Sequence, residues 1–312
     1  DNDLEIIVGG FSSPAKIFAI NADGSDVPGF PFELGEKMIK GLAVADFNDN
    51  GKVDIVAGTE NYNIYLINDD ATIAPGFPYL TGNKIRSAPA IAETESGKLI
   101  LSGSRDNNFY GLNADGSLRF TIPTGDYVVN SPAFMETESG LAIFFGSLDG
   151  NLYGIDVDGN PLAGWPISHS GSITGSPVIA DLNGDGMAEI VCGTQSAEIV
   201  AYNLDGSTFT YFPINNEFGF AGTPTITDTD GDLDLEILIG STGNLANIDF
   251  KDEGNSDDYW SLFHGNLKRT GYYTSDPVDD CSGCSLGDVN CDGTIDVLDI
   301  VRAVYIIMND PP

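Results

Sequence analysis

The sequence predicts an all-β protein built from repeated four-stranded units, and three observations lead to this class. A short apolar phrase that ends in glycine recurs six times, as EIIVGG (5–10), DIVAGT (54–59), LILSGS (99–104), AIFFGS (142–147), EIVCGT (189–194) and EILIGS (236–241). The shared glycines recur every 43 to 49 residues, at Gly9, Gly58, Gly103, Gly146, Gly193 and Gly240. No helical periodicity precedes residue 295. Six repeats of about 45 residues, each with four strands, are typical of a six-bladed β-propeller.

Each repeat supplies its four elements in the same order. The glycine phrase is a buried strand, because it is short, apolar and rich in β-branched residues. A second strand ends in a reverse turn, and we interpret its aspartates as turn residues rather than catalysts: Asp23, Asp115, Asp158 and Asp205. A third piece carries proline, which favours the edge of a sheet, at 28–32, 75–79 and 163–167. The fourth strand precedes the next repeat, at 40–46, 86–93, 130–136, 175–181 and 221–228.

The strands do not come in equal numbers, because the glycine phrase occurs six times and the fourth strand five times. We therefore expect a propeller over residues 1–252 whose first blade lacks one strand. Such a blade exposes an unpaired edge unless another segment covers it. Three sources are open: a segment upstream of residue 1, the C-terminal tail folding back, or a strand from a neighbouring chain. The segment VYIIMND (304–310) is apolar enough to be such a donor.

Three repeats insert an acidic loop before the glycine phrase, at 46–54, 181–189 and 228–236. Oxygen-bearing side chains occupy positions 1, 3, 5 and 9 of each loop, and Ca²⁺ takes six to eight oxygens, as a tight loop can present them. Two other repeats cross this junction with AETESGKLI (92–100) and METESGLAI (135–143), which are typical of plain turns. We therefore predict calcium rather than a solvated acidic turn, with the ligands Asp46, Asn48, Asn50, Asp54, Asp181, Asn183, Asp185, Glu189, Asp228, Asp230, Asp232 and Glu236.

Part of a fourth loop opens the chain. Asp1 aligns with Asp185 and Asp232, and Glu5 aligns with Glu189 and Glu236. Residue 1 therefore occupies position 5 of a loop whose first ligands would precede this chain.

The loop, the strand and the glycine ending together resemble the FG-GAP repeats of integrin-α-type propellers and of secreted bacterial and archaeal proteins. The resemblance covers roughly residues 1–252. It implies that the acidic loops bind calcium and that the fold is a scaffold for adhesion and interaction. Leu233 departs from the pattern, because the family carries glycine at this sixth position of the loop.

The C-terminal part divides into three predicted segments. Residues 253–274 form a closing segment whose aromatic side chains pack on the last blade, with a ligand-stacking surface around Trp260 as the alternative. Residues 275–286 are a polar linker. Residues 287–312 have EF-hand spacing, with Asp in place of Glu at the last position, and resemble one half of a dockerin repeat. The predicted ligands here are Asp288, Asn290, Asp292, Asp296 and Asp299.

The four cysteines fall into two groups. Cys281, Cys284 and Cys291 crowd together near the C-terminus, where a disulfide is favoured over zinc because no fourth ligand is near in sequence. Cys192 lies alone in an apolar strand and is expected to be a buried thiol.

Composition narrows the function. The net charge of −34 disfavours nucleic acid and anionic membranes and suits divalent cations. No apolar stretch approaches the length of a bilayer span, and neither His169 nor His264 lies in a catalytic motif. We expect a non-enzymatic, calcium-binding protein, extracellular or on the cell surface, that assembles with itself, as an oligomer or filament, or with another surface protein.

Two alternatives remain open at this stage. One is an adhesion propeller that binds carbohydrate or protein through exposed aromatic side chains. Trp165, Tyr211 and Phe218 are candidates, although core packing explains these three residues equally well. The other is the non-catalytic part of a larger secreted hydrolase.

Overall fold

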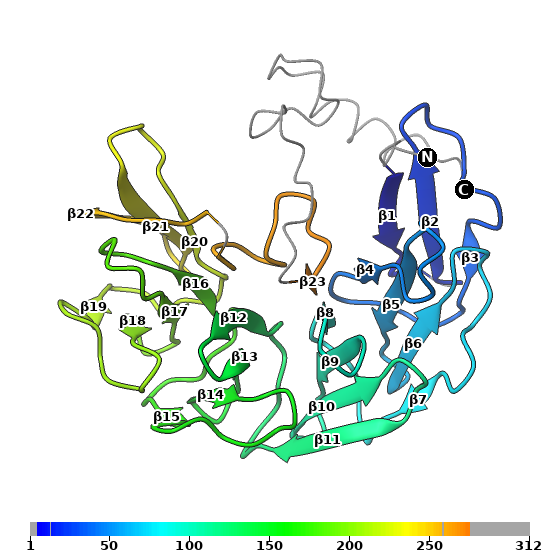
Figure 1. Cartoon of the computed structure of the whole chain (residues 1–312), viewed down its shortest axis with the longest axis horizontal. Helices are drawn as coiled ribbons and strands as arrows, with labels where there is room; N and C mark the ends of the chain where they lie inside the picture. The colour runs from blue at the N-terminus through cyan, green and yellow to red at the C-terminus, as the bar shows by residue number, and fades with distance from the viewer. Residues whose placement is uncertain (1–4, 13, 258, 275–312) are drawn as a thin grey trace.

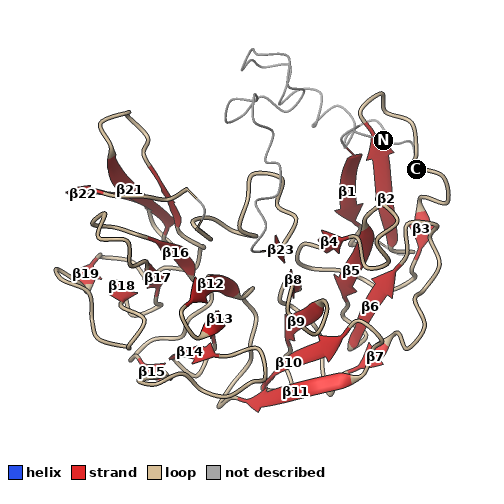
Figure 2. Ribbon diagram, viewed as in Figure 1, coloured by secondary structure: helices blue, strands red, loops and turns tan. Residues whose placement is uncertain are grey.

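The computed structural model describes residues 5–12, 14–257 and 259–274, which form an all-β structure of six small sheets (Figure 1). Antiparallel strands alternate with turns and loops, and these residues contain no helix (Figure 2). None of them accordingly provides a helix of the length and apolarity that a membrane crossing requires. The predicted linker 275–286, the loop with Asp288 to Asp299, the clustered cysteines and Asp1 lie outside the described residues.

The sheets follow one another along the chain. The first holds β1 (Glu5–Gly9), β2 (Lys16–Asn21) and β3 (Phe32–Glu33), and the second holds β4 (Ala43–Ala45), β5 (Asp54–Gly58), β6 (Asn63–Ile67) and β7 (Tyr79–Leu80). The third holds β8 (Ala90–Ala92), β9 (Leu99–Gly103), β10 (Asn108–Asn113), β11 (Leu118–Pro123) and β23 (Tyr272–Tyr273). The fourth holds β12 (Ala133–Thr137), β13 (Gly140–Gly146), β14 (Asn151–Ile155) and β15 (Ile167–Ser168). The fifth holds β16 (Val178–Ala180), β17 (Glu189–Gly193), β18 (Glu198–Tyr202) and β19 (Ile214–Asn215), and the sixth holds β20 (Thr225–Thr227), β21 (Asp234–Gly240) and β22 (Leu245–Glu253).

The predicted repeat is confirmed at the level of six sheets consistent with a six-bladed propeller. In sheets two to five, a short strand that we call the inner strand pairs with the glycine strand, which pairs with a third strand and then with an outer strand. Three of the four predicted turn aspartates accept backbone N–H groups in their turns: Asp23, Asp115 and Asp205 each accept the N–H of the serine two residues later. The fourth differs, because Asp156 accepts the turn N–H groups of Asp158 and Asn160, whereas the carboxylate of Asp158 pairs with Arg119.

The recurring glycine has a packing cause. A side chain at Gly58 would collide with Ile85, one at Gly103 with Val128, and one at Gly146 with Ile173. Each of these apolar residues is fully buried and lies in the segment that leads into the next inner strand. The missing Cβ thus lets neighbouring sheets approach closely, which a repeating sheet-on-sheet core requires.

The six sheets follow an arc, with the first and the last at its two ends (Figure 1). The first sheet lacks an inner strand, as predicted, so β1 is an edge strand among the described residues. Its burial reflects this position: Val8 is 39% exposed, whereas the equivalent Ala57 and Cys192 are fully buried. The sixth sheet also has three strands, because no outer strand follows β22 in the described part of the chain.

The closing segment corrects a prediction, because it does not pack on the last blade alone. It lies inside the arc (Figure 1), and its carbonyl groups accept backbone N–H groups from inner strands of four sheets. These bonds join Val44 to Thr270, Ile91 to Gly271, Ile179 to Trp260, and Ile226 to Ser261. The backbone N–H groups on the free edge of each inner strand need acceptors when they are buried. The carbonyl groups of the closing segment supply these acceptors, because the segment crosses all four sheets.

Aromatic packing holds the same segment against the fourth sheet. The Trp260 ring meets Phe134 edge-on at a centroid distance of 4.8 Å, and Tyr273 lies 5.6 Å from Phe134. Trp260 is 4% exposed, which favours the core interpretation over a ligand-stacking surface. β23 then runs parallel to β8 as a fifth strand of the third sheet.

We expect the buried His264 of this segment to make stability depend on pH. Burial lowers the pKa of His264 to about 4, below the value of about 6.5 in an unfolded chain. Neutral His264 therefore makes its full contribution to the free energy of unfolding above pH 6.5. This contribution falls by at most about 3 kcal/mol as the pH drops toward 4 and below, because the unfolded chain takes up the proton more readily. Urea unfolding across this range should show the wild type losing more stability than His264→Asn, whose asparagine tolerates the positive φ of 64°. Equal losses in both proteins would contradict this role for His264.

Candidate metal centre

The three acidic loops share one backbone arrangement, although they lie in different sheets. In each, the carboxylate at position 1 accepts the backbone N–H of position 6: Gly51 donates to Asp46 at 2.7 Å, Gly186 to Asp181 at 2.8 Å, and Leu233 to Asp228 at 3.1 Å. Such bonds wrap the loop around its first side chain.

The carboxylate at position 9 closes each loop from the start of the glycine strand. Asp54 accepts the N–H of Phe47 at 2.9 Å, Glu189 that of Leu182 at 2.8 Å, and Glu236 that of Thr229 at 2.6 Å. All three carboxylates are buried, at 3% exposure or less. The predicted first and last ligands of each loop are thus held in place by the backbone itself.

Position 6 requires a left-handed backbone in all three loops. Gly51 and Gly186 both have φ of 82°, and Leu233 has φ of 76°. Glycine at this position therefore meets a conformational requirement, and Leu233 carries strain of about 1–2 kcal/mol there.

Leu233→Gly is expected to stabilise the protein by roughly 0.5–1 kcal/mol, because relief of the strain exceeds the entropy that glycine loses on folding. Leu233 is 64% exposed, so little apolar burial is lost. Chemical denaturation measures the gain, and the reverse change Gly186→Leu should lower stability. A loss of stability in Leu233→Gly would show that the backbone of this loop is not strained.

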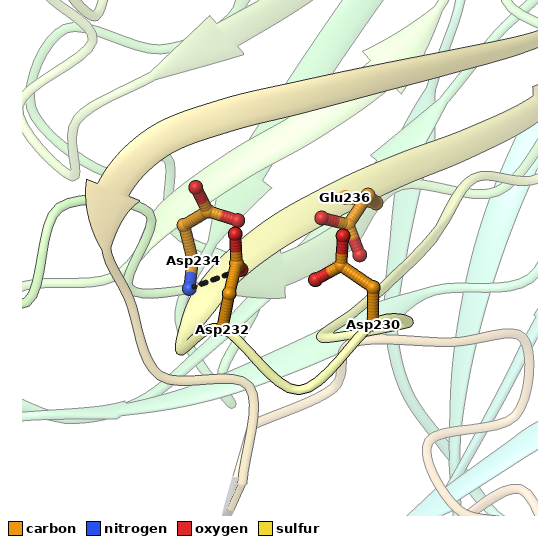
Figure 3. Close-up of side chains that lie close together, drawn as sticks. All are labelled: Asp230, Asp232, Asp234 and Glu236. Atoms are coloured by element: carbon orange, nitrogen blue, oxygen red, sulfur yellow. Dashed lines mark hydrogen bonds between the residues drawn. The ribbon is translucent and has the colours of Figure 1, made fainter.

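Four carboxylates gather in the loop of the sixth sheet, as Figure 3 shows. One oxygen from each of Asp230, Asp232, Asp234 and Glu236 lies within 4.8 Å of the others, so this cluster could hold a metal ion. Three of the four predicted ligands of this loop meet here. Asp228 is not one of the four, and its carboxylate accepts the backbone N–H groups of Asp230, Gly231 and Leu233.

Asp234 is the functional candidate that the sequence analysis missed. It stands at position 7 of the loop, outside the predicted ligand positions 1, 3, 5 and 9, yet its carboxylate joins the cluster. A signal was present, because acidic residues alternate without a break from 228 to 236.

The electrostatics of this cluster favour a cation. Repulsion from Asp232 raises the pKa of Asp230. The Asp234 side chain is only 10% exposed, and its buried Oδ1 has no hydrogen-bond partner among the described residues. An orphaned buried carboxylate oxygen beside three other carboxylates fits a metal ion that prefers oxygen ligands.

Lys251 supplies positive charge next to the cluster. Its ammonium lies 2.6 Å from Asp249, 3.1 Å from Asp234 and 3.7 Å from Asp232. The side chain is 66% exposed, so it can turn away into solvent when another cation arrives.

The other two loops show less convergence. Within the part of the chain that the structure describes, the 228–236 loop is the one place where three or more such groups come together. In the 181–189 loop, burial and then the charges of Asp181 and Asp185 raise the pKa of Glu189 to about 7. Asn183 donates to Asp185 at 3.1 Å. In the 46–54 loop, the Asn48 amide reaches Asp54, and the Asn50 amide instead donates to Asp69.

No protein-family model matches the chain, and a search of curated proteins found no match. Solved β-propeller structures are similar to it at low identity. The computationally designed Ika8 protein has a TM-score of 0.56 at 13% identity over 78% of this chain and 67% of that chain. The Vibrio cholerae biofilm matrix protein Bap1 has a TM-score of 0.56 at 20% identity over 72% of this chain and 37% of that chain. BamB from Moraxella catarrhalis has a TM-score of 0.49 at 15% identity over 67% of this chain and 60% of that chain. The match therefore spans less than two thirds of BamB and of Bap1, and the similarity concerns the fold.

Proposed function

We propose that the chain is a non-enzymatic, calcium-stabilised interaction and assembly module of the FG-GAP type, working outside the cell or on its surface. The observation that carries this proposal is the cluster of Asp230, Asp232, Asp234 and Glu236. Extracellular fluids supply calcium at the concentrations that such modules need, since their affinities are about 10⁻⁴–10⁻³ M. The half-dockerin character of residues 287–312, with its own calcium loop, belongs to the same proposal.

The state of the usual catalytic side chains supports a non-enzymatic role. Burial raises the pKa of the Cys192 thiol to about 12, so this confirmed buried cysteine is a poor nucleophile. His264 is buried within the closing segment, and its Nδ1 is hydrogen-bonded to the carbonyl of Arg269. Both ring nitrogens of His169 are hydrogen-bonded, to the carbonyl of Gly150 and to the hydroxyl of Tyr202.

The edge of the first sheet supports the assembly part of the proposal. β1 has the apolar sequence of its buried counterparts, but its inner edge has no strand partner among the described residues. A strand from elsewhere in the chain or from a neighbouring copy would complete the sheet, and the apolar segment 304–310 is our candidate for it. Head-to-tail donation between copies would produce a polymer.

Light scattering on a sizing column, in millimolar calcium and again with chelator, tests the proposal. We expect large species in calcium that dissociate when it is removed. A monomer at high concentration in calcium would remove the assembly part and leave an adhesion module.

Two of the three aromatic candidates for an adhesion surface are exposed, and the third is buried. Tyr211 is 78% exposed and Phe218 is 42% exposed. Trp165, the third candidate, belongs to the core, because it is 6% exposed and donates its indole N–H to the carbonyl of Leu204.

A further inference from the structure

Three consecutive sheets fill the same groove with a tyrosine. Their third strands carry Asn-x-Tyr, and each tyrosine hydroxyl donates to a carboxylate: Tyr65 to Glu36 at 3.0 Å, Tyr110 to Asp106 at 2.6 Å, and Tyr153 to Asp149 at 2.8 Å. Asp106 and Asp149 also accept a backbone N–H from the preceding sheet, given by Gly82 and Gly125. The tyrosine, the acid and the glycine thus close the junction between neighbouring sheets.

The fifth sheet breaks this pattern at every one of those positions. Val200 stands where the tyrosine would be, Ser196 replaces the aspartate, and Ser170 replaces the glycine of the preceding sheet. The strand begins with Glu198 instead of asparagine. A cavity of about 260 Å³ lies here between the fourth and fifth sheets, lined by Ser168, His169, Ser170, Glu198, Val200 and Tyr202, with Thr208 and Pro213.

The histidine in this cavity is held in one neutral form. His169 Nδ1 lies 3.1 Å from the Gly150 carbonyl, which can only accept, so Nδ1 carries the proton. Nε2 then accepts from the Tyr202 hydroxyl at 2.8 Å. Burial lowers the pKa of His169, which keeps the ring neutral at physiological pH.

The groups left free to meet a ligand are mostly acceptors and hydroxyls. The Tyr202 oxygen keeps a lone pair after it donates to His169. Glu198 uses one oxygen to accept from Ser196 at 3.0 Å, and its other oxygen is free to accept from a ligand. The hydroxyl-bearing Ser170 and Thr208 line the cavity together with the apolar Val200 and Pro213.

We propose that this cavity binds one neutral hexopyranose residue of a glycan. Such a ring offers several hydroxyl donors to the acceptors and an apolar C–H face to the valine and proline, and its size fits the volume. Glu198 and the net charge of −34 oppose an anionic sugar. The inference gives a ligand to the proposed interaction module and rests on that function, but it does not depend on assembly or on which loops hold calcium.

Saturation-transfer NMR on the full chain in millimolar calcium tests the site. The probes are methyl α-D-glucopyranoside, methyl α-D-mannopyranoside and methyl β-D-galactopyranoside, with methyl β-D-glucuronide as the anionic comparison. We expect transfer to at least one neutral glycoside and at least tenfold weaker binding of the glucuronide. Val200→Tyr restores the side chain of the neighbouring sheets and should abolish transfer.

Two further variants make the outcome decisive. Thr208→Tyr obstructs the exposed rim without entering the core, so it tests the site even where Val200→Tyr fails to fold. Leu204→Tyr adds the same ring to the same sheet away from the cavity lining and should leave binding unchanged. No transfer to any glycoside, or equal transfer in Thr208→Tyr, overturns the proposal. If chelator lowers the stability but no glycoside binds, the sugar site is wrong and the calcium-stabilised module stands. If a glycoside binds but chelator does not change the stability, the calcium role is wrong and the sugar site stands.

Discussion

Millimolar calcium is expected to raise the melting temperature of this protein by roughly 10 °C over the chelated form. Carboxylates that converge without a cation repel one another, as the raised pKa of Asp230 already indicates. With a dissociation constant of about 10⁻⁴ M, 1 mM calcium is about ten times that constant, so each bound ion stabilises the folded state by about 1.4 kcal/mol. Two ions in the propeller loops together give about 3 kcal/mol, and each kcal/mol shifts the melting temperature of a domain of this size by about 2–4 °C. Differential scanning fluorimetry with calcium and with chelator measures the shift.

Matched variants tie that shift to the cluster. Asp230→Asn together with Glu236→Gln removes two charges from the cluster and should reduce the calcium-dependent shift. Glu93→Gln together with Glu95→Gln, at the plain turn of the third sheet, removes two charges where no calcium is predicted and should leave it unchanged. Sodium chloride at equal ionic strength controls for general screening. If the melting temperature were the same with calcium and with chelator, calcium would not stabilise this fold.

Trp260→Ala is expected to cost about 3–5 kcal/mol, the largest effect of any single substitution considered for this fold. The indole ring is buried between Phe134 and Tyr273. The backbone carbonyl of Trp260 accepts the N–H of Ile179. Removing it leaves a cavity where the closing segment joins the fourth and fifth sheets. Chemical denaturation of the variant should show the midpoint moving to lower denaturant concentration.

Two controls separate packing from a general loss of aromatic surface. Trp260→Phe keeps a ring against Phe134 and should lose much less stability. Tyr211→Ala removes an aromatic side chain that is 78% exposed and should change stability by less than about 0.5 kcal/mol. If Trp260→Ala were as stable as the wild type, the closing segment would not hold the sheets together.

The repeat could be read from the sequence because its causes are local. The glycine phrase, the aspartate turns and the proline-bearing pieces each reflect a backbone or packing requirement that recurs in several of the sheets. The loop geometry was equally accessible, since positions 1, 6 and 9 depend on hydrogen bonds within nine residues. Even the departure at Leu233 fell at a position that demands a positive φ.

The path of the closing segment could not be predicted, because it depends on contacts between distant residues. Thr270 meets Val44, and Tyr273 meets Glu93, across more than 170 positions of the chain. The cavity at Val200 was also hidden, since an apolar residue in a strand carries no sign that its counterparts are tyrosines that fill a groove. Asp234 was missed for a third reason: the spacing of the loop placed ligands at positions 1, 3, 5 and 9, whereas the fold also brings the position 7 carboxylate to the cluster.

The most direct test of the calcium account is a count of bound ions by native mass spectrometry of the full chain from calcium-containing buffer. We predict at least three calcium ions per chain, two in the propeller loops and one in the loop of residues 288–299, and one fewer in the variant that combines Asp230→Asn with Glu236→Gln. A chain that carries no calcium, or a variant that retains every ion of the wild type, would contradict the assignment.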